Sequence, residues 1–345
     1  MRLTFFASTL LFAAFGGGCA HSAISPVAPI PVAAQPMTDL DAEQPDAPVK
    51  VDRPERARLL AQKLNAMGLQ ATMDKDDDVV FRSGTQSYML STEKPHFFRL
   101  ERPTKWSAKN TSDHTDMLRT LSKLNNDRRW VKFSYLPKSK VVTLGIEQLV
   151  ATDDDMIALM PRALEYLKEA EKKMPSRVQR APSVLGMNVG KAQALHVGAV
   201  GALARHYADM LNGEGTEADI DGDGDVVFAR EGIKLFVSVH EDSPEYLRLV
   251  SLWGGNEFPG NEAKKLEVCN DINARVAVAK CSILRGDIVI SSEQMLGDAT
   301  HVSGQFKGGI RAISTAAHML KEASGGGNTT SADPLGAPPN PANMM

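Results

Sequence analysis

The acidic residues of this chain are the ones whose spacing points most directly to chemistry. Asp219, Asp221, Asp223 and Asp225 occupy alternating positions, and glycine fills two of the positions between them. Oxygen ligands at alternating positions followed by glycine are typical of the start of a calcium loop. The twelfth position of such a loop needs a bidentate Glu, and this chain has Arg230 there. The four aspartates are therefore a weak candidate for a metal site, and a hairpin turn, for which Asp-Gly is a common signal, is the favoured interpretation.

The acidic segment occurs twice. Residues 74–81 read Asp-Lys-Asp-Asp-Asp-Val-Val-Phe, and residues 221–228 read Asp-Gly-Asp-Gly-Asp-Val-Val-Phe. Three further residue types keep their order and spacing, in the pairs Asn125 and Asn273, Lys132 and Lys280, and Glu147 and Glu293. The offsets of 147, 148 and 146 residues are nearly constant over a whole domain length. The sequence therefore predicts a tandem duplication.

The repeated polar residues have both chemical and structural interpretations. Two carboxylates could do general acid–base work. One Glu in each copy, however, favours a repeated structural role, such as ending the last strand or capping the helix after it. The two Asn residues are expected to close the second helix of each copy, because Asn tolerates a left-handed backbone. The two Lys residues are expected at edge or outward positions of a strand.

Other catalytic signatures are missing from the sequence. There is no Gly-x-Ser-x-Gly, and the His residues have no metal-ligand spacing. The segment 186–192 imitates a phosphate loop but is one residue short and lacks the Ser or Thr. Neither half has the basic stripe with aromatic residues that nucleic-acid binding needs. We therefore predict no catalytic residue, no cofactor, no enzymatic activity and no nucleic-acid partner.

Hydrophobic spacing predicts the same elements in both copies. Each copy opens with a helix and continues with three or four short strands, a second helix, two strands and a closing helix. Ser112 and Asn261 are the expected N-caps of the second helices. Pro161 and the pair Gly308-Gly309 predict a start or kink in the closing helices. The order α-β-β-β(-β)-α-β-β-α predicts an α+β fold with an antiparallel sheet and helices packed on one face.

This pattern resembles the YbjN family. The resemblance rests on the opening helix, the Asp-rich hairpin before Val-Val-Phe, the second helix ending in Leu-Asn or Ile-Asn, the Val-Lys or Ala-Lys strand, and the closing helix. It predicts two YbjN-like domains, residues 53–174 and 193–323, joined by a linker at 175–192. The resemblance implies a fold like that of type III secretion chaperones. It also implies a non-catalytic module that binds other proteins.

The N-terminal residues predict export. Arg2 and the apolar stretch from Leu3 to Phe15 are typical of a signal peptide, residues 1–19. Small residues before Cys19 resemble a lipoprotein signal, which implies lipidation of Cys19 and a membrane anchor in the periplasm. Ordinary cleavage after Ala20 or Ser22 is the alternative. Residues 20–52 and 324–345 are rich in Pro, Ala or Gly and are predicted to be a disordered linker and tail.

The other two cysteines, Cys269 and Cys281, are disulfide candidates. An exported protein meets an oxidising compartment, where an even pair of cysteines favours a bond. The alternative is that both are small buried apolar residues. Their counterparts in the first copy, Leu121 and Phe133, have the character of core residues.

Charge is divided unevenly along the chain. Residues 51–180 hold 24 Lys and Arg and 18 Asp and Glu, for +6, and residues 181–345 hold 13 and 20, for −7. Opposite net charges favour docking of the copies on each other as an internal pseudo-dimer in a monomeric chain. Chance divergence, with two independent domains, is the alternative. The expected contact uses the second helices and the strands after them, at Arg128, Arg129 and Trp130 on one side and Glu267 and Asp271 on the other.

Two function classes follow from these features. The first is a non-catalytic envelope module that binds a protein partner, chaperone-like or regulatory. The alternative is a metal-dependent or hydrolytic periplasmic enzyme with a site between the two repeats. A cleft that gathers Glu147, Glu293, His240 and the Asp runs would favour the enzyme. A largest pocket lined only by apolar side chains would favour the binding module.

Overall fold

The structure is a computed structural model that describes residues 52–104, 106, 111–175, 197–238, 245–254, 257–258, 260–296 and 302–324. The predicted signal peptide with Cys19, the linker before residue 52 and the C-terminal tail lie outside the described residues. So do His240 and the segment 186–192. Among the described helices, none is both long enough and apolar enough to cross a membrane.

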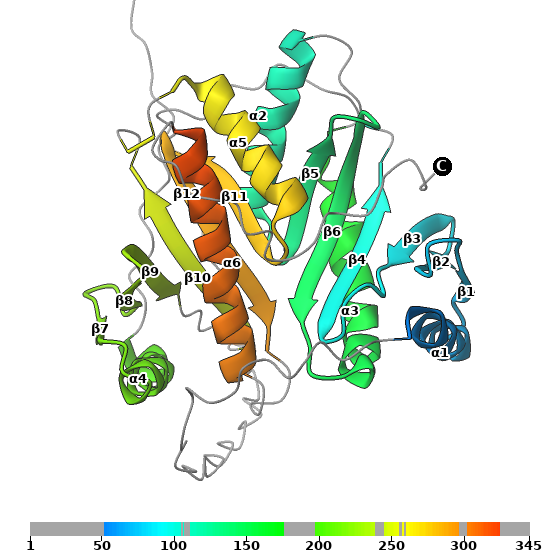
Figure 1. Cartoon of the computed structure of the whole chain (residues 1–345), viewed down its shortest axis with the longest axis horizontal. Coiled ribbons are helices and arrows are strands. Elements are labelled where there is room, and N and C mark those ends of the chain that lie inside the picture. The colour runs from blue at the N-terminus through cyan, green and yellow to red at the C-terminus, as the bar shows by residue number, and fades with distance from the viewer. Residues whose placement is uncertain are drawn as a thin grey trace, which may run out of the picture. The chain divides into compact units, whose positions relative to one another are not determined.

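The described residues of the N-terminal half form three helices and one six-stranded antiparallel sheet (Figure 1). The strands follow the order β1-β2-β3-β4-β6-β5 across the sheet. The elements are α1 (Arg53–Ala66), β1 (Gln70–Met73), β2 (Val79–Ser83), β3 (Gln86–Leu90), β4 (Phe97–Pro103), α2 (Thr111–Asp127), β5 (Val131–Leu136), β6 (Val141–Leu149) and α3 (Asp153–Lys172).

The C-terminal half has the same element order and the same sheet order, β7-β8-β9-β10-β12-β11. The prediction of an α+β fold with antiparallel sheets is confirmed, with four strands before the second helix in each half. The elements are α4 (Val197–Gly213), β7 (Ala218–Ile220), β8 (Val226–Arg230), β9 (Ile233–Ser238), β10 (Tyr246–Trp253), α5 (Glu262–Arg275), β11 (Ala279–Leu284), β12 (Asp287–Met295) and α6 (Val302–Ala323).

Local side-chain chemistry explains where several helices begin. Asp52 accepts a hydrogen bond from the N–H of Glu55 at the start of α1, and Thr152 forms a capping box with Asp155 at the start of α3. Asn261 caps α5, as predicted. The prediction for Ser112 is wrong, because α2 begins at Thr111 and Ser112 lies inside the helix.

The predicted interruption of the closing helices at Pro161 and Gly308-Gly309 does not divide them. α3 and α6 each run through these positions as one helix. The glycines have a packing reason. A Cβ atom built on Gly308 would lie 2.1 Å from Leu149 Cδ1, and one on Gly309 would lie 2.6 Å from Leu249 Cδ1. Glycine therefore lets α6 lie close to the sheets, where Figure 1 shows it crossing β12 and β10.

Both faces of the central strands are buried, so the prediction of helices on one face is incomplete. β6 is buried from Val142 to Gln148, and β12 from Ile288 to Met295. Since successive strand residues point to opposite faces, such runs require cover on both sides. α3 packs on β6 and α6 on β12, while α5 contacts β5, α2 contacts β11, and β6 contacts β12.

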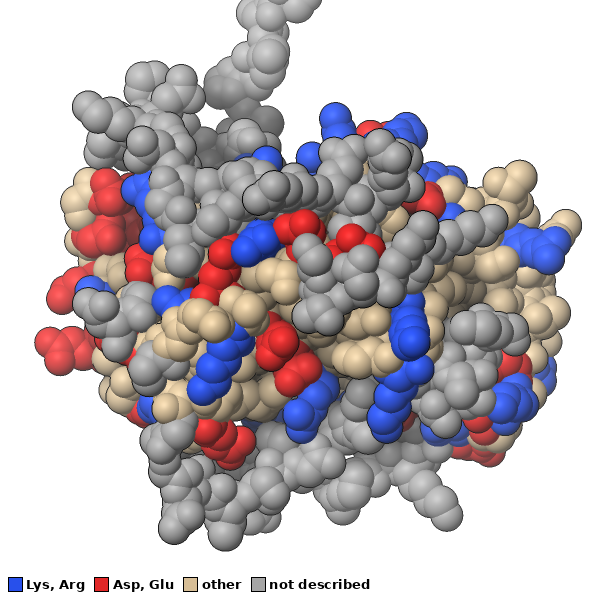
Figure 2. Space-filling view, turned by 90° about the horizontal axis from the view of Figure 1, so that it is seen from above, with Lys and Arg blue, Asp and Glu red and all other residues tan. Residues whose placement is uncertain are grey.

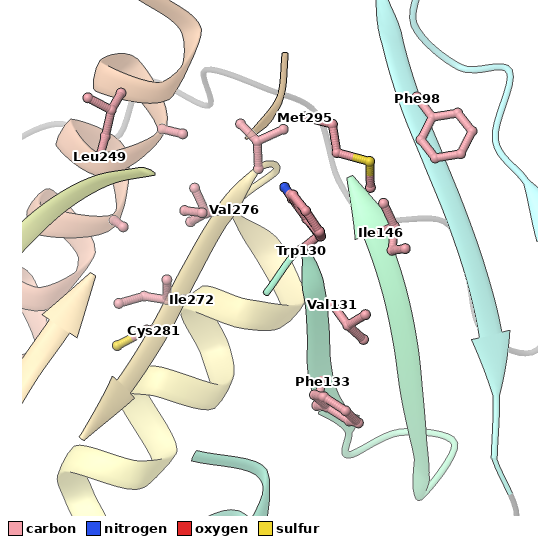
Figure 3. Close-up of a cluster of buried hydrophobic side chains, with 14 of the residues drawn as sticks. Phe98, Trp130, Val131, Phe133, Ile146, Leu249, Ile272, Val276, Cys281 and Met295 are labelled. Atoms are coloured by element: carbon pink, nitrogen blue, oxygen red, sulfur yellow. The ribbon is translucent and has the colours of Figure 1, made fainter. Parts of the chain in front are cut away.

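The buried apolar side chains form one cluster that includes residues of both halves. Figure 3 shows Trp130 and Ile146 of the first half beside Val276 and Met295 of the second. Trp130 also stacks at an angle on Tyr166 of α3 and edge-on against Tyr246 of β10. Such aromatic pairs add to the stability gained from burial. The core is thus shared across the two sheets.

Candidate functional site at the centre of the two sheets

Two buried ion pairs occupy corresponding places in the two sheets. Lys132 is the second residue of β5, and its Nζ lies 2.5 Å from Oε2 of Glu147, the seventh residue of β6. Lys280 is the second residue of β11, and its Nζ lies 2.8 Å from Oε2 of Glu293, the seventh residue of β12. β5 and β11 are the last strands of their sheets. The Lys residues therefore do lie on edge strands, but they are not outward: they point into the protein.

Each carboxylate also bonds to the backbone of the other half. Oε2 of Glu147 accepts a hydrogen bond from the N–H of Val278 at 2.7 Å, and Oε2 of Glu293 accepts one from Trp130 at 2.7 Å. The lysines complete the reciprocal pattern. Lys132 donates to the carbonyl of Val276 at 3.0 Å, and Lys280 donates to the carbonyl of Arg128 at 2.6 Å. Every charge in the two pairs therefore contacts both halves.

The two backbone donors have left-handed conformations. Trp130 has φ 60° and Val278 has φ 53°, and each immediately precedes the edge strand of its sheet. Bulky and β-branched residues rarely adopt positive φ, because the Cβ atom clashes with the backbone. The strained turn directs each N–H toward the opposite carboxylate. No local sequence signal predicts this arrangement, since neither residue is Gly, Asn or Asp.

Burial and pairing together set the charge state of the site. Burial lowers the pKa of Lys132 and of Lys280 from the ordinary lysine value, against the pull of their Glu partners. Burial alone would raise the pKa of Glu293. Lys280, Arg248 and the N–H of Trp130 outweigh it, and the pKa is lowered. Glu293 is thus held as a carboxylate that its neighbours neutralise.

The space around the ion pairs is too small for a substrate. A hollow of about 20 Å³ is lined by Trp130, Val278, Ala279 and the four charged residues of the two pairs. That volume holds about one water molecule, whereas ligand pockets are usually about 300–1,000 Å³. The structure does gather Glu147 and Glu293 as the enzyme hypothesis requires. Their oxygens, however, already bind lysine and backbone N–H groups, so the geometry supports a structural role rather than acid–base work.

The structural role of the two glutamates differs from the one expected. They neither end their strands nor cap a helix, because they lie inside β6 and β12 and bond across the halves. The expectation for Asn125 and Asn273 is also wrong. Both are buried inside α2 and α5, and each bonds to the N–H and C=O of one strand residue, Phe133 or Cys281. These bonds pin the edge strand to its helix.

A second pair of asparagines plays the same part at the opening helices. Asn65 bonds to the N–H and C=O of Ala71, and Asn212 bonds to those of Ala218. Neither residue belongs to a motif that stands out in the sequence. Their spacing of 147 residues, equal to that of the Asp-rich hairpins, is the signal that could have found them.

The edge strands obtain further hydrogen bonds from the opposite half. Asn270 of α5 bonds to both the N–H and the C=O of Tyr135 on β5, and Ser122 of α2 accepts from the N–H of Ile283 on β11. Exposed strand edges invite pairing with other chains. Side chains of the other half cover these edges here.

The middle strands make the same kind of exchange. Gln148 accepts from the N–H of Met295, and Gln294 accepts from the N–H of Leu149. Both glutamine side chains are fully buried. Buried amides are costly unless they are hydrogen-bonded, so these bonds hold the two central strands in one relative position.

The predicted contact between the halves uses different acidic residues. Arg128, Arg129 and Trp130 do contact the second half, Arg129 through the ring of Tyr246, but Glu267 and Asp271 are exposed on α5. The acidic group that meets Trp130 is Glu293. Among the described residues, two ion pairs join the halves, Arg119 with Glu262 and Arg162 with Glu245, whose nitrogen and oxygen atoms lie within 4 Å of each other. In both, the cation belongs to the first half and the anion to the second.

One of the candidate metal ligands, Asp221, closes a hairpin turn. Oδ1 of Asp221 accepts hydrogen bonds from the N–H groups of Asp223 and Asp225 at 3.0 and 3.1 Å. Asp74 makes the same two bonds to Asp76 and Asp78 in the first half. A carboxylate that caps a turn in this way has one oxygen already occupied. The described residues contain no group of three or more His, Cys, Asp and Glu placed to hold a metal ion.

Cys269 and Cys281 are joined by a disulfide in the structure, with a Cα–Cα distance of 4.9 Å. Both are also buried, so the bond lies within the apolar cluster. It links α5 to β11. The corresponding residues of the first half, Leu121 and Phe133, are buried at the same places on α2 and β5.

The comparisons with known proteins identify one region. Residues 205–324 match the YbjN family, whose description is "Putative bacterial sensory transduction regulator". The chain therefore contains a YbjN domain, which extends from within α4 to the end of α6. None of the curated proteins and none of the solved structures matches the chain.

Proposed function

We propose that this protein is a non-catalytic module that binds a protein partner, built from two YbjN-like copies that dock as an internal pseudo-dimer. The regulatory description of the matched family is compatible with such a role. Support for a second copy at residues 53–174 comes from the shared element order and sheet order. A type III secretion chaperone-like fold for each copy is part of the same proposal.

The observation that carries the non-catalytic role is the use of Glu147 and Glu293. Both carboxylates are neutralised by buried lysines and bonded to the opposite half, in a space of about 20 Å³. A general acid or base must reach a proton on a substrate, and no substrate fits beside these groups. A larger open groove of about 770 Å³ lies elsewhere and is lined largely by charged and polar side chains. The expectation of a largest pocket lined only by apolar side chains is therefore not met by this groove. Its polar lining suits a partner with a polar surface.

The reciprocal bonds across the centre support docking of the copies and a monomeric chain. Edge strands β5 and β11, which could otherwise pair with a second molecule, are covered from within the chain. Light scattering of the full-length secreted form should give the mass of one chain. A stable dimer of two chains would contradict the monomer. A small-angle X-ray scattering profile of two separated bodies would contradict docking of the copies.

Export to the periplasm and lipidation of Cys19 remain part of the proposal, supported by the N-terminal sequence alone. Cys19→Ser should move the protein from the membrane fraction to the soluble periplasmic fraction. Membrane retention of that variant would exclude the anchor and favour cleavage after Ala20 or Ser22.

Partner binding is tested by capture from bacterial envelope extracts, followed by cross-linking of the complex. We expect one partner to be retained equally by the wild type and by Glu147→Gln, with cross-links to exposed outer elements. On the face seen in Figure 2, Lys and Arg alternate with Asp and Glu, as suits a protein partner better than nucleic acid. Hydrolysis of a model ester, peptide or phosphate substrate that Glu147→Gln abolishes would favour the alternative, a periplasmic enzyme.

A further inference from the structure

Each half has an open groove between its second hairpin and its closing helix. The first lies between the β2–β3 turn at Gly84 and α3, and its volume is about 770 Å³. The second lies between the β8–β9 turn at Glu231 and α6, and its volume is about 370 Å³. Leu164 of α3 and Ile310 of α6 line the two grooves at corresponding helix positions. The two grooves therefore occupy corresponding positions in the two halves.

Several charged side chains of the first groove have partners within the chain. Lys168 donates to Oγ of Ser83 at 3.1 Å, and Lys172 pairs with Glu169 at 2.5 Å. Glu171 accepts from Gln86 and forms an ion pair with Arg102. Its ionic groups are thus largely satisfied within the chain.

The second groove is basic. Lys307, Arg311 and His318 line it from α6, Arg230 lines it from the end of β8, and Glu231 is the single acid in the lining. Arg230, Arg311 and His318 are exposed, and Lys307 is half-buried. In the part of the chain that the structure describes, no ion pair involves these four side chains. At the positions of Lys307 and Arg311, α3 has Pro161 and Glu165, so the basic character belongs to this half alone.

A neighbouring hollow extends the basic surface along α6. It has a volume of about 470 Å³ and shares Lys307 and Arg311 with the groove. Gly304 marks one end of the lining on α6 and His318 the other. Fourteen helical steps of 1.5 Å place these ends about 21 Å apart, the length of six or seven extended residues.

We infer that this basic groove on α6 binds an extended acidic segment of the protein partner. Lys307 and Arg311 are one helical turn apart, a rise of about 6 Å. Alternate side chains on one face of an extended peptide are about 6.6 Å apart, so acids at every second position face both cations. The charges of the groove complement such a segment. This inference rests on the proposed protein-binding function and names the surface and the chemistry of the partner.

The experiment is a fluorescence anisotropy titration of the full chain with a labelled peptide of four Glu-Ser repeats. We expect saturable binding that weakens as salt is added, because exposed charges are screened. The variant Lys307→Glu with Arg311→Glu should weaken binding by about tenfold or more, a loss of about 1.4 kcal/mol. The matched control, Lys168→Glu with Lys172→Glu in the first groove, has the same change in net charge and should retain binding within about twofold.

Several outcomes would overturn the inference. One is the absence of saturable binding to the acidic peptide, and another is an equal loss in the control, which would mean that only net charge matters. Binding of vesicles containing anionic phospholipid through the same two residues, without peptide binding, would assign the surface to a membrane. If a captured envelope partner is retained equally by Lys307→Glu with Arg311→Glu and by the wild type, the groove is excluded while the protein-binding function stands.

Discussion

The two halves agree at the centre of the molecule and differ around it. Both place a lysine on the edge strand and a glutamate on the neighbouring strand, and each glutamate bonds to the other half. Among the described residues, the C-terminal half alone has a disulfide between its second helix and edge strand, glycines where its closing helix meets the sheets, and a basic groove.

The difference teaches where sequence change is tolerated. A buried charge without its partner is strongly destabilising, so a central ion pair can change only if both members change together. The exposed charges of the grooves carry smaller costs, since a solvated charge is worth little. Leu121 and Phe133 fill the places of the two cysteines without a covalent bond, and the halves still share one sheet order.

The largest expected effect tests the central pairs. Glu293→Ala leaves Lys280 buried without its carboxylate and should lower the free energy of unfolding by about 3–5 kcal/mol. Glu147→Ala should have a similar cost, because both side chains of the Lys132–Glu147 pair are also largely buried. Urea unfolding followed by circular dichroism measures both. The double variant Lys280→Met with Glu293→Leu is the control and should recover most of the loss.

Acid removes the same charge while leaving the side chain in place. Because the folded protein lowers the pKa of Glu293 below its ordinary value of 4.5, the unfolded chain binds this proton at higher pH than the folded chain. Stability is fully present above pH 4.5 and falls as the pH drops through the lowered pKa. Glu293→Gln should flatten this part of the curve of unfolding free energy against pH. An unchanged slope in the variant would mean that another carboxylate controls acid unfolding.

Removing the disulfide tests whether a covalent bond stabilises the second half where side-chain packing alone stabilises the first. Cys269→Ala with Cys281→Ala removes a link between residues 12 apart in sequence. Loss of such a short loop closure should lower the unfolding free energy by about 2–3 kcal/mol. Dithiothreitol should produce a similar loss in the wild type and none in the double variant. If reductant has no effect on wild-type stability, the bond is unformed and the halves rely on the same packing.

The smallest expected effects compare glycines of the closing helix. Gly309→Ala places a methyl group 2.6 Å from Leu249 Cδ1 and should destabilise by about 1–2 kcal/mol, since overpacking outweighs helix propensity. Gly304→Ala meets no atom within 4 Å and should stabilise by up to about 1 kcal/mol. α3 has the buried Ala163 where α6 has Gly309. Equal melting temperatures for both variants would mean that a methyl group fits between α6 and the sheet, as the side chain of Ala163 does on α3.

Much of the fold was predictable because its signals are local. The Asp-rich turns, the cap at Asn261 and the apolar spacing of the helices depend on residues within a few positions of one another. The start of α2 was misplaced by two residues, because an N-cap at Ser112 predicts a first helical residue at 113. The pair Gly308-Gly309 was interpreted as a breaker rather than a packing device. The atoms that require glycine there belong to Leu149 and Leu249, which are remote in sequence.

By itself, the sequence determined the order of elements, the repetition of that order, and the identity of the residues that recur. It indicated that Glu147, Glu293, Lys132 and Lys280 matter without saying to what they bind. Only the tertiary structure decided that Trp130 bonds to Glu293 across 163 residues and Val278 to Glu147 across 131. The physical reason is that a buried charge must be neutralised wherever the fold places it. Its partner is chosen by the docking of two sheets, which no local pattern records.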